Sequence, residues 1–73
     1  MVSRQAFVNK IRELGYTFKG ERKRIYLWRK TGHAHFISVP KAEKLEDEFV
    51  ISSLRQAGQT QEQIDQFLKA AKS

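Results

Sequence analysis

Several common features are absent from this 73-residue sequence, and each absence excludes a class of protein. There is no cysteine, so disulfides and thiolate metal sites are impossible. No apolar run approaches the roughly 18–20 residues that a membrane helix needs, and the N-terminus lacks the charged-then-apolar layout of a signal peptide. We therefore expect a soluble, cytoplasmic protein of one domain over residues 1–73, with no membrane partner.

Positive charge is what the sequence has in excess, and it is concentrated in the middle. Fourteen Lys and Arg residues outnumber eight Asp and Glu residues, for a net charge of +6. Residues 19–44 contain eight of the basic and only two of the acidic residues, whereas the flanks are balanced. A clustered positive field attracts polyanions, so we expect a nucleic-acid ligand, with RNA favoured and DNA possible.

The spacing of apolar residues predicts three helices. Residues 3–14 carry Phe7, Ile11 and Leu14 on one face, with Ser3 as N-cap and Gly15 after the end. Residues 45–57 return to helical spacing from Leu45 onwards. Residues 60–71 form a last helix, in which Thr60 and Gln63 make a capping box.

Residues 16–40 change to a period of two and predict a three-stranded antiparallel meander. A short strand at 16–18 is followed by a polar turn at 19–23, a strand at 24–30, a turn at Thr31 and Gly32, and a strand at 34–39. Pro40 ends the meander because it has no N–H to offer a neighbouring strand. The predicted fold class is α+β, in the order α-β-β-β-α-α, with helices on one sheet face and the other face free.

The middle strand is the most informative segment, because one of its faces alternates basic and aromatic residues. Arg24, Tyr26, Trp28 and Lys30 share this face, where rings could stack on bases and cations could hold phosphates. Alternatively, Tyr26 and Trp28 pack under a helix, as aromatic residues commonly do. The candidate nucleic-acid-binding residues are Lys19, Arg22, Lys23, Arg24, Tyr26, Trp28, Arg29, Lys30, Lys41 and Lys44.

Two histidines, His33 and His35, are the candidate catalytic residues. On a regular strand they would share a face, and together they could supply the base and the acid of metal-independent RNA cleavage. A metal site would need a third ligand, and none is suitably spaced. No glycine motif that binds phosphate is present, so we expect no metal and no cofactor.

Three stretches of the chain resemble the HicA family of small toxins: residues 8–16 (VNKIRELGY), 37–40 (ISVP) and 53–58 (SLRQAG). The similarity covers roughly residues 5–58. It implies a fold like that of a double-stranded-RNA-binding domain (dsRBD), and an mRNA-cleaving toxin restrained by a HicB-type antitoxin.

The first hairpin departs from this family pattern. HicA toxins usually carry a Gly-Ser-His triplet there, whose histidine is catalytic, whereas residues 20–24 of this chain read GERKR. The histidine would fall near Lys23, so its role cannot be carried over. We therefore expect an RNA-binding domain without the usual nuclease site. The alternatives are a toxin that cleaves RNA with His33 or His35, and a protein-interaction module that docks an acidic partner.

Overall fold

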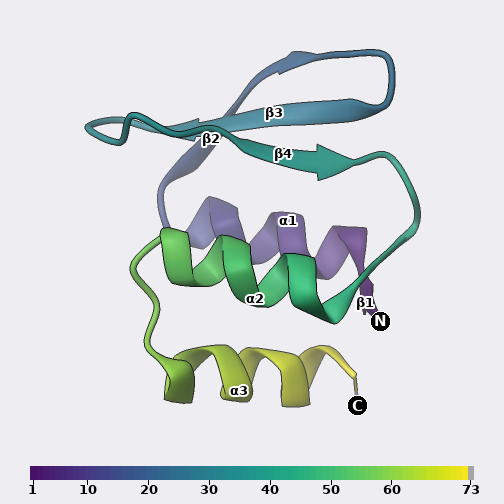
Figure 1. The fold of residues 1–73 in the computed structure, drawn as a ribbon, viewed down its shortest axis with the longest axis vertical. Coiled ribbons are helices and arrows are strands. Elements are labelled where there is room, and N and C mark those ends of the chain that lie inside the picture. Colours follow the sequence, from purple (N-terminus) through teal and green to yellow (C-terminus); the bar gives the residue numbers. More distant parts are fainter. Residues whose placement is uncertain (73) are drawn as a thin grey trace.

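A computed structural model describes residues 1–72 and shows three layers (Figure 1). A three-stranded sheet lies over a layer of two helices, and a third helix lies beneath them. The elements are β1 (Val2–Ser3), α1 (Arg4–Glu13), β2 (Tyr16–Glu21), β3 (Ile25–Lys30), β4 (Ile37–Pro40), β5 (Lys44–Leu45), α2 (Asp47–Gln56) and α3 (Gln61–Ala71). The predicted α+β class and helix–meander–helix order are confirmed; Ser73, the end of the predicted domain, lies outside the described residues.

The helix ends follow from local chemistry. The Ser3 hydroxyl accepts a hydrogen bond from the Ala6 amide at 3.0 Å, which satisfies one of the free N–H groups that begin a helix. Gly15 has φ +97°, a left-handed conformation that glycine adopts without strain, and it ends α1. At α3, the Thr60 hydroxyl and the Gln63 side chain bond each other's backbone amides, so the predicted capping box is confirmed.

The meander is antiparallel in the order β2-β3-β4, but its boundaries differ from the prediction. β2 continues to Glu21 and contains a β-bulge. Phe18 pairs with Trp28 and Gly20 pairs with Leu27, so Lys19 is the extra residue of the bulge. The first turn is therefore shorter than predicted. The last strand begins only at Ile37, so residues 34–36 lie in a loop.

A second, two-stranded sheet was not predicted. β1 pairs with β5, with Val2 opposite Leu45 and Ser3 opposite Lys44. Leu45 therefore lies in a strand, and α2 begins at Asp47 rather than at residue 45. The Asp47 carboxylate contacts the N-terminal ammonium at 3.3 Å and also pairs with Lys72, which fastens the start and the end of the described chain to the start of α2.

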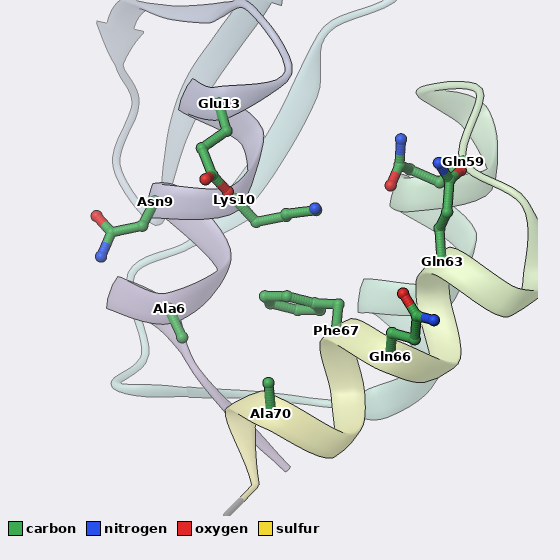
Figure 2. Close-up of a pocket in the computed structure, with 9 residues that line it drawn as sticks. All are labelled: Ala6, Asn9, Lys10, Glu13, Gln59, Gln63, Gln66, Phe67 and Ala70. Atoms are coloured by element: carbon green, nitrogen blue, oxygen red, sulfur yellow. The ribbon is translucent and has the colours of Figure 1, made fainter.

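α3 packs against the other helices while leaving a cleft beside α1. The cleft has a volume of about 410 Å³, and Figure 2 shows the Phe67 ring pointing from α3 toward α1 within it. Its walls are rich in amides, including Asn9, Gln63 and Gln66. None of the predicted site residues lines this cleft.

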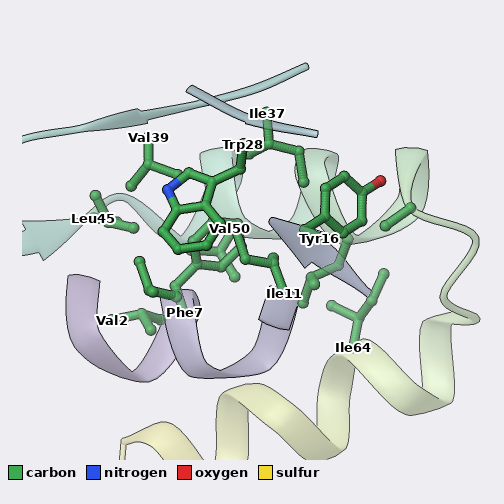
Figure 3. Close-up of a cluster of buried hydrophobic side chains, with 13 residues drawn as sticks. Val2, Phe7, Ile11, Tyr16, Trp28, Ile37, Val39, Leu45, Val50 and Ile64 are labelled. Carbon is green, nitrogen blue, oxygen red and sulfur yellow. The ribbon is translucent and has the colours of Figure 1, made fainter. Parts of the chain in front are cut away.

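One hydrophobic core lies between the sheet and the helices (Figure 3). α1 supplies Phe7 and Ile11, and α2 supplies Val50 and Leu54. Ile64 enters the same core from α3 and is fully buried. Phe67, Leu68 and Ala71 of α3 pack against this core as partly buried residues, so α3 is part of the core.

Candidate nucleic-acid interface

The β2–β3 turn presents three consecutive cations to solvent. Arg22, Lys23 and Arg24 are all exposed, and their side chains form no ion pair or hydrogen bond with residues 1–72. The backbone of the turn is fixed, because the Arg22 amide donates to the Ile25 carbonyl at 2.8 Å. The Lys41 amide also donates to the Arg24 carbonyl at 3.2 Å. A fixed backbone with free side chains is well suited to hold several phosphates.

Lys41 reaches the same end of the sheet but is partly engaged. Its ammonium group pairs with the Glu21 carboxylate at 2.7 Å and lies 5.1 Å from the centre of the Tyr26 ring. An exposed ion pair of this kind contributes little to stability. Lys41 therefore adds less free positive charge to this end than the turn residues do.

A shallow hollow of about 240 Å³ lies between Lys19, Arg29, Thr31 and Gly32. Thr17 pairs with Arg29 across the β2–β3 ladder, on the sheet face opposite the one that carries Tyr16 and Trp28. The Arg29 Nε donates to the His33 carbonyl at 3.2 Å, and its guanidinium lies 5.5 Å from the centre of the Phe36 ring. No carboxylate among residues 1–72 pairs with Lys19 or Arg29, so the hollow is cationic.

Tyr26 and Trp28 do not form an exposed stacking surface. They lie on the helix-facing side of β3, beside Val39 and Ile37 of β4. Only 5% of Trp28 is exposed, and Tyr26 is half-buried against the core. Trp28 cannot stack on a base in this position, so the alternative of packing under the helices is the correct one for it.

The remaining predicted cations are dispersed. Lys30 is half-buried on the helix-facing side of β3, with its side chain beside Gly15. Lys44 is exposed in β5, which belongs to the separate two-stranded sheet. Neither residue lines the hollow formed by Lys19 and Arg29.

The two histidines occupy the β3–β4 loop but are not equivalent. The His33 ring packs edge-on against the Tyr16 ring, with 6.3 Å between the ring centres, and its amide donates to the Lys30 carbonyl at 3.0 Å. His35 is exposed and forms no hydrogen bond, ion pair or ring contact with the described residues. Within residues 1–72, no group of three His, Cys, Asp or Glu side chains could hold a metal ion.

Three residues outside the predicted set belong to the aromatic side of the sheet or lie over it. The Arg12 guanidinium lies 5.2 Å from the centre of the Trp28 ring, and that of Arg4 lies 5.5 Å from the centre of the Tyr26 ring. Phe18, in edge strand β2, is 51% exposed. The eight-residue separation of Arg4 and Arg12 was a usable signal, because residues that far apart lie toward the same side of a helix.

Within residues 1–72, two ionisable groups have shifted pKa values. Hydrogen bonding to Lys72 lowers the pKa of the Asp47 carboxyl. Burial raises this pKa in part, and the N-terminal ammonium lowers it further. Burial raises the pKa of the Tyr16 phenol. Neither group faces the hollow or the β2–β3 turn, so both shifts concern stability rather than ligand binding.

Among the described residues, no helix has both the length and the apolar character required to cross a membrane. Compared with models of known protein families, with curated proteins and with solved structures, the chain gives no match.

Proposed function

We propose that this chain is an RNA-binding domain whose interface comprises the β2–β3 hairpin and the sheet face that the helices leave uncovered. One observation carries the proposal. Five basic side chains of this region have no acidic partner among residues 1–72: Lys19, Arg22, Lys23, Arg24 and Arg29. They form two groups at opposite ends of the hairpin, Arg22, Lys23 and Arg24 in the β2–β3 turn and Lys19 and Arg29 at the hollow. Unpaired cations of this kind attract a polyanion that can run from one group to the other.

The expected ligand is RNA because of the resemblance to HicA toxins, which implies an mRNA target. Binding without cleavage is the simpler form of the proposal, since Lys23 stands near the position where that family has its catalytic histidine. Loss of a general base typically lowers a rate by about 10²–10⁴-fold. The His33 ring packs against the Tyr16 ring, and within residues 1–72 no contact joins the His33 and His35 rings as an acid–base pair.

The salt dependence of binding provides a quantitative test. Each phosphate neutralised on a single strand contributes about −0.7 to the slope of log K against log salt concentration. Five contacts therefore predict a slope of about −3.5 or steeper. Changing Arg22, Lys23 and Arg24 to glutamine should reduce the steepness of this slope by about 2.

The assay is fluorescence polarisation with labelled single-stranded RNA, duplex RNA and duplex DNA, at about 50 mM and about 200 mM salt. The matched control changes Lys10, Arg55 and Lys69 to glutamine, which removes the same net charge from the three helices. We expect the hairpin variant to lose most of its affinity and the control variant to keep it. Equal losses in the two variants would mean that net charge, not the hairpin, governs binding.

Two further measurements separate the alternative functions. RNA recovered after incubation with the protein is expected to be intact, and fragments that disappear in the His35→Ala variant would instead indicate a nuclease. Polyglutamate should compete only weakly with RNA. If polyglutamate binds tightly while all three nucleic acids fail to bind at low salt, the cations serve an acidic protein partner.

A further inference from the structure

Phe18 is an exposed aromatic ring that its neighbours hold in place. Its ring centre lies 5.6 Å from that of Trp28, at an interplanar angle of 70°, and 6.1 Å from that of Tyr26. About half of the Phe18 side chain is nevertheless exposed. A ring that is already ordered loses little conformational entropy when a ligand stacks on it.

Phe18, Tyr26 and Trp28 form an aromatic row, and two arginines of α1 lie over it. Arg12 contacts the Trp28 ring, which is also a neighbour of Phe18. Arg4 contacts the Tyr26 ring and donates a hydrogen bond to the Lys41 carbonyl. Neither guanidinium pairs with a carboxylate among residues 1–72. A guanidinium that stacks through its face keeps its N–H edges available for a phosphate.

These groups are spread along α1 and along the β2 edge of the sheet. Arg4 and Arg12 are eight residues apart, which corresponds to about 12 Å along the axis of α1. Phe18 and Lys19 are adjacent in β2, and Lys19 belongs to the hollow on the opposite sheet face. The β2 edge therefore connects the aromatic row of the α1 side with the cationic hollow.

This arrangement, together with the RNA binding proposed above, has a specific consequence. We propose that Phe18 stacks on one unpaired base of a single-stranded nucleic acid, while Arg12 and Arg4 hold phosphates of the same strand. Bases inside a duplex are stacked on one another and cannot reach a protein ring, whereas unpaired bases can. The ligand class is therefore a single strand, or a loop or bulge, rather than a continuous duplex.

Phe36, in the β3–β4 loop, provides a matched control. It is also half-exposed, at 44%, but its ring is already a neighbour of the Arg29 guanidinium. Phe18 and Phe36 can each be changed to leucine, which removes the aromatic face and keeps an apolar side chain of similar volume. Phe36→Leu can change the affinity for every strand alike through its neighbour Arg29, whereas only the Phe18 change should alter the preference for strands that carry bases.

The experiment compares a single-stranded RNA with an abasic strand of the same length, which keeps the phosphates and lacks the bases. Stacking on one base is worth about 5- to 150-fold in affinity. The unaltered protein should prefer the base-bearing strand by at least the lower figure, and Phe18→Leu should remove most of this preference. Phe36→Leu and Phe18→Tyr should keep the preference. Single-stranded DNA tests whether the 2′-hydroxyl contributes as well.

Trp28 supplies an independent readout, because it is the only tryptophan and its ring contacts that of Phe18. In the unaltered protein, the base-bearing strand should change Trp28 emission more than the abasic strand does. This measurement does not depend on whether Phe18→Leu folds.

If Phe18→Leu folds and retains the preference for bases while RNA still binds, the stacking role is wrong and the RNA-binding function survives. Equal affinities of the unaltered protein for the two strands would also overturn the stacking role. If the unaltered protein binds no nucleic acid at low salt, the proposed function fails and the stacking site fails with it.

Discussion

Replacing Ile64 with alanine tests whether α3 is an integral part of the fold. Ile64 is fully buried and belongs to the same core as Phe7, Val50 and Leu54. Truncation of a buried isoleucine to alanine costs about 2–5 kcal/mol, because apolar burial is lost and a cavity remains. A domain of this length has a total stability of about 4–11 kcal/mol. A loss of about 3 kcal/mol would therefore be a large share of it.

The expected result is a clear fall in both thermal and urea stability. For a small domain, 1 kcal/mol corresponds to about 4–8 °C in Tm, so a loss of about 3 kcal/mol lowers Tm by about 12–24 °C. Circular dichroism during urea denaturation should show a lower midpoint with an unchanged m value, which indicates a loss of stability rather than a change in the exposed surface.

Gln66 supplies the control for this measurement. It lies on α3 but is exposed, so Gln66→Ala should change the free energy of unfolding by no more than about 0.5 kcal/mol. If Ile64→Ala costs less than about 1 kcal/mol, α3 does not pack on the core as described. The amide-rich cleft between α1 and α3 would then lose its basis as well.

Two further predictions concern pH. Asp47 has a lowered pKa in the folded state, so the stability it contributes is present above the ordinary carboxyl pKa and is lost as pH falls through the folded pKa. Asp47→Asn should make the urea midpoint less dependent on pH between about 2 and 5, and an unchanged acid dependence would show that the contacts with Lys72 and the N-terminal ammonium are unimportant. Tyr16 has a raised pKa in the folded state, so the stability that this group contributes is present below the ordinary phenol pKa of about 10. That stability is lost as pH rises through the folded-state pKa. Tyr16→Phe should reduce the alkaline loss of stability, measured by the same titration between about pH 8 and 11; an identical loss in the variant would show that another group is responsible.

The helices were predictable because their signals are local. The N-cap at Ser3, the left-handed glycine at residue 15 and the capping box of Thr60 and Gln63 each involve residues within one turn of a helix end. The two-stranded sheet was not predictable, because two-residue strands have no periodicity. Leu45 fits helical spacing as well as it fits a strand, and its pairing with Val2 decides between them.

The candidate site was only partly predictable. The cations of the β2–β3 turn are exposed, as their charge required. The orientation of β3 could not be settled from its own residues, because Ile25 and Leu27 make the opposite face apolar as well. The helices cover the side that carries Trp28, so the orientation of β3 is decided by tertiary packing and not by the strand itself. The exposure of Phe18 was not predictable from its own segment, because it depends on the position of β2 at the sheet edge.

The bulge at Lys19 also bears on how separate copies of the chain meet. A sheet edge displays unpaired N–H and C=O groups, and a flat edge recruits strands from other molecules. β2 interrupts its edge with an extra residue and an exposed lysine, while the opposite edge, β4, is short and ends at Pro40. Such interruptions oppose strand addition and aggregation. The protein can therefore display a half-exposed phenylalanine at a sheet margin without inviting edge-to-edge assembly.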